Sequence, residues 1–154
     1  MYNCKARRPS VKLVYNGIKL KQNTDYTMEY RNDLKVGKGS IVITGKGNFS
    51  GTKTVGFKIV PESTTISRLT AASGKRVAVK WKKQSVQTSG YQISYAANSK
   101  FKKAKTVTVK GSRTISKTIK TAGTSKTCYV KVRTYKAVNG SNYYSAWSGT
   151  KKSK

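Results

Sequence analysis

The sequence predicts an all-β chain that forms two antiparallel β-sandwiches in tandem. Apolar and polar residues alternate with a period of two along most of the chain, and no segment shows a helical period. Strand-like runs are separated by turn signals such as Asn16-Gly17 and Asn139-Gly140. A linker-like run that contains Pro61 coincides with a change in charge. These three observations favour two all-β domains joined near Pro61.

The strands of the first half are short. Within 26–30, Tyr26, Met28 and Tyr30 alternate onto one face, which leaves Glu29 on the predicted solvent face. The Gly-rich run 45–51 is read as a tight turn between two strands. The expected strands are 11–15, 18–21, 26–30, 41–43 and 55–59.

The strands of the second half are longer and follow the same rule. In 77–82, Val77, Val79 and Trp81 point inward, and the lysines between them point outward. The spacing of the strands is typical of an antiparallel sandwich. The expected strands are 66–69, 77–82, 91–95, 106–110, 114–120, 128–133 and 143–147.

We therefore divide the chain into four parts. A small β-repeat occupies 1–60, a linker 61–64, a larger β-domain 65–150 and a basic tail 151–154. Whether the two domains dock rigidly, and whether the chain forms oligomers, is left open.

The composition argues against catalysis. The chain has no histidine and only 4 Asp+Glu, so His-based triads, His-ligated metals and most carboxylate pairs cannot be assembled. Cys4 and Cys128 are far apart and belong to no CxxC pair. The Gly-rich run 45–51 matches neither of the phosphate-binding loop patterns GxxxxGK(S/T) and GxGxxG. We predict no catalytic residue, no metal site, no cofactor and no membrane span.

The chain is strongly basic, and the charge is divided unevenly. It has 33 Lys+Arg against 4 Asp+Glu, a formal net charge of +29. All four acids, Asp25, Glu29, Asp33 and Glu62, lie in the first 62 residues. Residues 63–154 carry 21 of the basic residues and no acid. Any contact with a polyanion is therefore expected mainly on the second domain.

Two segments resemble known modules. Residues 64–150 resemble a fibronectin type III domain of bacterial surface proteins, on the segments 77–81, 90–95, 129–135 and 144–148. Residues 2–60 are similar to the small Ig-like β-repeat that often precedes it in large secreted proteins of gut Firmicutes. The carriers there are Tyr2-Asn3, 41–52 and 57–59. Both sandwiches are thus expected to be Ig-like or fibronectin type III-like.

The resemblance also predicts where the protein is located, and two cysteines of this chain depart from the pattern of the families it resembles. It implies an extracellular or cell-surface location and a chain that is part of a larger protein, with the first repeat truncated at its N-terminus. Cys128 stands where the fibronectin pattern usually has its corner tyrosine, and Cys4 where the Ig-like repeat usually has glycine.

Clustered lysines are the candidate polyanion contacts. Their alternation onto outward strand positions also fits a solvated face that blunts sheet edges, and both interpretations stay open. The cations are mostly lysine, whereas recognition of base edges favours arginine forks. The candidate contacts are Lys80, Lys82 and Lys83, and Lys100, Lys102, Lys103 and Lys105; Lys151, Lys152 and Lys154 form a third cluster in the basic tail.

Aromatic residues recur at inward positions, so core packing is their expected role. Tyr143, Tyr144 and Trp147, near the last hairpin, are expected to be partly exposed and are the candidates for a stacking contact.

These observations favour a non-catalytic spacer or adhesion module of a larger secreted or cell-surface bacterial protein. Its basic faces would contact cell-wall or host polyanions nonspecifically. The alternative is a small intracellular nucleic-acid-binding protein, which the high charge would also suit. A third interpretation is an inert spacer.

Overall fold

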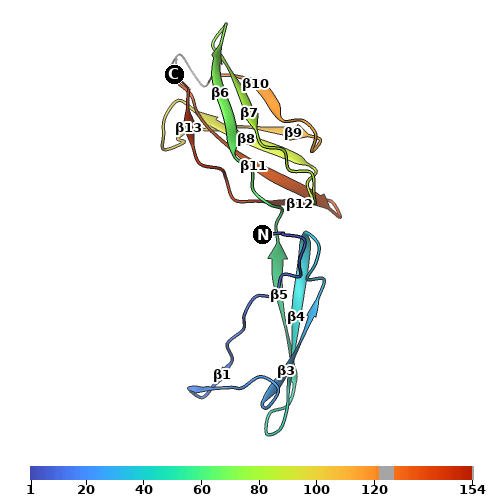
Figure 1. Cartoon of the computed structure of the whole chain (residues 1–154). Helices are drawn as coiled ribbons and strands as arrows, with labels where there is room; N and C mark the ends of the chain where they lie inside the picture. Colours follow the sequence, from blue (N-terminus) through green and yellow to red (C-terminus); the bar gives the residue numbers. More distant parts are fainter. Residues whose placement is uncertain (122–126, 154) are drawn as a thin grey trace. The chain divides into compact units, whose positions relative to one another are not determined.

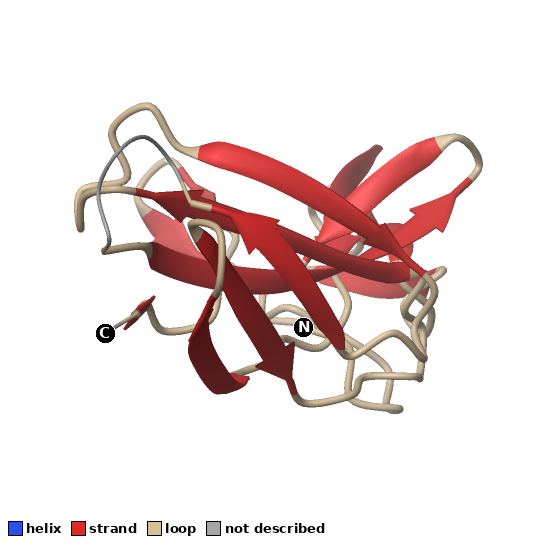
Figure 2. Cartoon of the chain, turned by 90° about the horizontal axis from the view of Figure 1, so that it is seen from above, coloured by secondary structure: helices blue, strands red, loops and turns tan. Residues whose placement is uncertain are grey.

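The structure, a computed structural model, describes residues 1–121 and 127–153. Strands and loops make up all of this part, with no helix among the described residues (Figure 2). No helix there could cross a membrane. The chain divides into two compact units: the first unit is Tyr2–Ile59, and the second unit comprises the chain from Val60 onward together with Met1. The prediction of an all-β chain of antiparallel strands is confirmed.

The first unit contains a short hairpin and a three-stranded antiparallel sheet of order β3-β4-β5 (Figure 1). The hairpin turns at Asn16-Gly17, where both residues have positive φ (48° and 79°), as a two-residue turn that matches the twist of the strands requires. The strands are β1 Val14–Tyr15, β2 Ile18–Lys19, β3 Tyr26–Arg31, β4 Gly37–Gly45 and β5 Thr52–Ile59.

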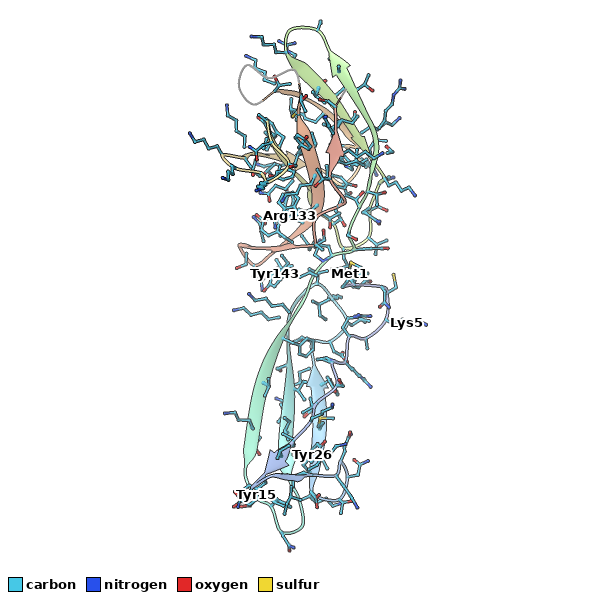
Figure 3. The ribbon with its side chains drawn as sticks, turned by 90° about the vertical axis from the view of Figure 1, so that its left-hand side faces the viewer. Met1, Lys5, Tyr15, Tyr26, Arg133 and Tyr143 are labelled. Atoms are coloured by element: carbon cyan, nitrogen blue, oxygen red, sulfur yellow. The ribbon has the colours of Figure 1, made fainter. Side chains whose placement is uncertain are left out.

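The core of the first unit lies on one face of this sheet. Tyr26, Ile41 and Ile43 are buried there, and Tyr26 is labelled in Figure 3. Leu13 and Leu20, which flank the hairpin, pack against them. Alternation along β3 leaves the Glu29 side chain exposed, as expected, where it pairs with Arg31 at 2.9 Å.

The second unit has two antiparallel sheets. One has the order β10-β7-β6; in the other, β12-β11-β8-β9, β13 also pairs with β11 (Figure 1). The Asn139-Gly140 turn joins β11 to β12. The strands are β6 Ile66–Ala72, β7 Arg76–Trp81, β8 Gly90–Ala96, β9 Lys105–Lys110, β10 Ser116–Lys120, β11 Tyr129–Val138, β12 Ser141–Tyr144 and β13 Lys151–Lys152.

The inward residues of both sheets form one core. Trp81 packs on Tyr91 with ring centroids 5.2 Å apart. Val130 and Val132 of β11 are fully buried beside Ile93 of β8. Cys128 is also buried in this core, whereas Cys4 of the first unit is exposed.

Several predicted boundaries are wrong; the strand expected at 128–133, for example, extends to Val138. Residues 61–64 are not a free linker: Pro61 and Thr64 are buried, and the Thr64 hydroxyl donates to the Lys82 carbonyl at 2.6 Å. The strand predicted at 143–147 ends at Tyr144.

The prediction of a basic tail at 151–154 is also wrong. Lys151 and Lys152 form β13, and Ser153 is buried; Lys154 lies outside the described residues. The composition of these two segments led to the wrong prediction, because Pro, Ser, Thr and Lys are common in linkers and tails. In the structure, the Thr64 and Ser153 hydroxyls and the main chain of Lys151 and Lys152 are paired with strands or loops of the second unit.

Candidate functional site

A stack of alternating cations and aromatic rings lies on the outward face of the sheet β12-β11-β8-β9. Along β11, Val130, Val132 and Thr134 are buried, and the residues between them face outward. The register sets Lys131 opposite Ser94 and Arg133 opposite Gln92. Two cations thus stand two positions apart on one strand.

Each of these cations lies between two rings. The Lys131 Nζ is 4.1 Å from the ring centroid of Phe101 and 5.2 Å from that of Trp147. The Arg133 Cζ is 4.2 Å from the Trp147 centroid and 3.9 Å from that of Tyr144. We call these five residues the cation–aromatic stack. Its order is Phe101, Lys131, Trp147, Arg133, Tyr144, and Trp147 is the ring that both cations share.

The connection between β8 and β9 positions Phe101. Asn98 closes the turn: its Oδ1 accepts the Lys102 N–H at 3.0 Å and its Nδ2 donates to the Lys102 carbonyl at 3.1 Å. Phe101 itself has a positive φ of 55°, and its N–H donates to the Asn98 carbonyl at 3.1 Å. The turn therefore holds the ring over Lys131 by main-chain geometry.

Serine hydroxyls position Trp147 where β12 has ended. The Ser145 Oγ accepts the Thr134 N–H at 3.1 Å, and the Ser148 Oγ accepts the Val132 N–H at 3.0 Å. The N–H groups of the same two serines donate back to the carbonyls of Thr134 and Val132. The segment that carries Trp147 is thus fixed to β11 on both sides of the ring.

Arg133 is half-buried and has no carboxylate partner in the part of the chain that the structure describes. Its Nε and Nη2 both donate to Gln92 Oε1, at 2.9 and 2.5 Å (Figure 3 labels Arg133). Partial burial lowers the pKa of the guanidinium, and Tyr144 opposes that shift. Gln92 is neutral, so the positive charge of Arg133 is not cancelled within the stack.

The seven lysines predicted as polyanion contacts are all exposed, but the structure divides them between the sheets. Lys80 lies on β7, in the sheet β10-β7-β6, and Lys82 and Lys83 follow that strand. Lys100, Lys102 and Lys103 lie in the connection that carries Phe101, and Lys105 begins β9 of the other sheet. Only this second group adjoins the cation–aromatic stack along the chain.

The three predicted exposed aromatics also separate. Tyr144 and Trp147 are partly exposed and belong to the cation–aromatic stack. The prediction is wrong for Tyr143, which is labelled in Figure 3 and is only 9% exposed. Tyr143 and Tyr144 are adjacent on β12 and therefore point to opposite faces of the sheet.

Sequence reasoning missed Phe101, Lys131, Arg133 and Gln92 as site residues. The available signal was the alternation of buried valines with Lys131 and Arg133 along β11. Among the described residues, no group of three or more His, Cys, Asp or Glu side chains could hold a metal ion. The cation–aromatic stack places fixed positive charge beside the faces of aromatic rings, an arrangement suited to binding rather than to bond-making or bond-breaking.

No protein-family model matches the chain, and no curated protein matches it either. Among solved structures, it is similar to the crystal structure of chicken CNTN1 FN1–FN3 domains, with a TM-score of 0.50 and 19% sequence identity. The similarity covers 77% of this chain and 42% of that one, so the chain spans less than half of that structure. At this identity the likeness concerns the fold alone. The chain has an Ig-like, fibronectin type III-like β-sandwich fold.

Proposed function

We propose that this chain is a non-catalytic spacer or adhesion segment, made of two tandem β-modules, of a larger secreted or cell-surface bacterial protein. Its second unit would contact cell-wall or host-surface polyanions. The fold supports a non-catalytic module. The bacterial surface context rests on the resemblance of segments such as 77–81 and 144–148 to surface-protein modules.

One observation carries the polyanion contact: positive charge in the second unit has almost no internal partner. Residues 63–154 contain no acid, and both ion pairs among the described residues, Arg8–Asp33 and Arg31–Glu29, lie in the first unit. Lysines free of carboxylates keep their charge available for external phosphate, sulfate or carboxylate groups.

Lys100, Lys102 and Lys103 are the lysines we expect to contribute most. The Asn98 turn orders the main chain of this segment, so the positions from which these lysines extend are fixed close to the stack along the chain. An ordered group of charges loses less conformational entropy on binding than a mobile one. Lys80, Lys82 and Lys83 would form a separate and weaker contact on the other sheet.

The test is a binding titration with teichoic acid, heparin, duplex DNA and RNA over a salt series. Lys100→Gln/Lys102→Gln/Lys103→Gln should weaken binding to teichoic acid and heparin by about tenfold at ~0.1 M salt and reduce the salt slope. The matched control removes the same charge from exposed lysines of the first unit, Lys12→Gln/Lys19→Gln/Lys53→Gln, and should have little effect.

Two results would contradict the proposal. Binding to nucleic acid alone, with a sequence preference at physiological salt, would favour the intracellular nucleic-acid-binding alternative. Equal losses in the two triple variants, with affinity no greater than that of a generic polycation, would leave an inert spacer.

A further inference from the structure

The first unit has a hollow of about 470 Å³ on its three-stranded sheet, remote in sequence from the basic groups of the second unit. Lys38, Ser40, Gly56 and Lys58 are among the residues that line it, together with Asn32, which directly follows β3. The volume lies within the range of about 300–1,000 Å³ typical of small-molecule sites.

The register of β4 and β5 places these residues on one face. Lys38 is opposite Lys58, and Ser40 is opposite Gly56. Successive side chains alternate between faces, so all four positions share the face that looks away from the core. Phe57 and Gly39, which are opposite each other between these positions, also line the hollow, and Phe57 packs against the core of the unit.

Gly56 creates the space. A Cβ placed on Gly56 would meet no atom nearer than the Gly39 carbonyl oxygen, at 3.9 Å. Its φ lies outside the positive range that favours glycine, so the backbone would accept a side chain. A side chain at position 56 would therefore fill the hollow without straining the strand.

The charge of the hollow is uncompensated. Lys38 and Lys58 are exposed and directly opposite each other, an arrangement that disfavours the sheet by like-charge repulsion. Nearby acids are engaged elsewhere: Asp33 pairs with Arg8 at 2.8 Å and Glu29 with Arg31 at 2.9 Å. A bound anion would relieve this repulsion.

We propose that this hollow binds an acidic sugar of one or two rings, whose carboxylate lies between Lys38 and Lys58. A bare phosphate ion would leave most of the volume empty. The Ser40 hydroxyl and the Asn32 amide offer hydrogen bonds to sugar hydroxyls, and the lysine methylenes offer apolar contact to a sugar ring. This site lies in the first unit and does not depend on the polyanion contact proposed for the second.

The test is a titration of the full chain with digalacturonic acid, followed by amide NMR shifts. We expect saturable shifts confined to residues around the hollow. Gly56→Val, which keeps every charge, and Lys38→Gln/Lys58→Gln should each weaken binding by about tenfold. Lys53→Gln, on the same strand and outside the hollow, is the charge control and should bind as the unchanged chain does.

Lactose, a neutral disaccharide, should produce no saturable shifts, and inorganic phosphate should bind at least about tenfold more weakly than digalacturonate. If Gly56→Val does not fold, Gly56→Ala adds a smaller side chain to the hollow and should also weaken binding of digalacturonate. The proposal is overturned if the Gly56 variants bind unchanged, if phosphate binds as well, or if the shifts spread over all lysines.

Discussion

Ser148 and Val132 are joined by two hydrogen bonds: the Val132 N–H donates to the Ser148 Oγ at 3.0 Å, and the Ser148 N–H donates to the Val132 carbonyl at 2.8 Å. Ser145 with Thr134 and Ser153 with Cys128 repeat this double contact. At these three positions of the last segment, a serine side chain thus takes the place of a main-chain acceptor.

Ser148→Ala should destabilise the second unit by about 1–2 kcal/mol, because it leaves the buried Val132 N–H without an acceptor. Urea denaturation followed by tryptophan fluorescence measures the loss. Ser99→Ala, at an exposed position of the same unit, is the control and should change stability by less than about 0.5 kcal/mol. Equal effects of the two substitutions would contradict the role assigned to the hydroxyl.

Trp147 should be energetically coupled to Lys131. A double-mutant cycle of Trp147→Ala with Lys131→Met isolates the cation–ring contact and should give a coupling of about 0.5–1 kcal/mol. The same cycle with Lys136→Met, on β11 but outside the cation–aromatic stack, should give a value near zero. A coupling that does not distinguish the two lysines would mean that the stack contributes only packing.

Gly90→Ala should be among the most damaging substitutions in the second unit. A Cβ on Gly90 would overlap the Val109 carbonyl oxygen and come within 2.9 Å of the Tyr135 ring, so strands β8 and β9 would have to separate. We expect a loss of about 3 kcal/mol or more. Gly149→Ala, where a Cβ meets no atom within 4 Å, should be neutral in the same denaturation measurement; a similar loss there would contradict the clash.

Tyr91 should make stability fall in alkaline solution. Burial raises the pKa of its hydroxyl above the ordinary value of 10.0, against an opposing hydrogen bond at Gln84. The folded protein holds this proton more strongly than the unfolded chain does. The resulting contribution to the free energy of unfolding is therefore complete below about pH 10, and it is lost as the pH rises through the pKa of Tyr91 in the folded protein.

Tyr91→Phe should therefore flatten the decline in unfolding free energy as the pH rises above about 10. Tyr15→Phe, at an exposed tyrosine of the first unit, should leave the decline unchanged. A decline in Tyr91→Phe as steep as that of the unchanged chain would contradict the assignment.

The strands were predictable because they depend on local alternation. Val77, Val79 and Trp81 are buried as their period-two pattern indicates, and Asn16-Gly17 turns the first hairpin. Thr64 and Lys151 were misplaced because their roles come from pairing with distant residues, Lys82 and Val130, which leaves no local pattern.

The cation–aromatic stack could be predicted only in part. Tyr144 and Trp147 were recognisable as aromatics near a hairpin. Their partners come from β11 and from the β8–β9 connection, so the stack exists only once β11 is in register with β8. Among the neighbouring lysines of its segment, Phe101 looked like part of a charge cluster instead of a ring that covers Lys131.

The double contacts of Ser145, Ser148 and Ser153 also interrupt one edge of the sheet β12-β11-β8-β9. They divide the chain beside β11 into β12, of four residues, and β13, of two. An open, straight strand would present a row of unpaired main-chain groups to another molecule. Here an incoming strand would find no long continuous edge beside β11, which disfavours extension of the sheet by another molecule on this side.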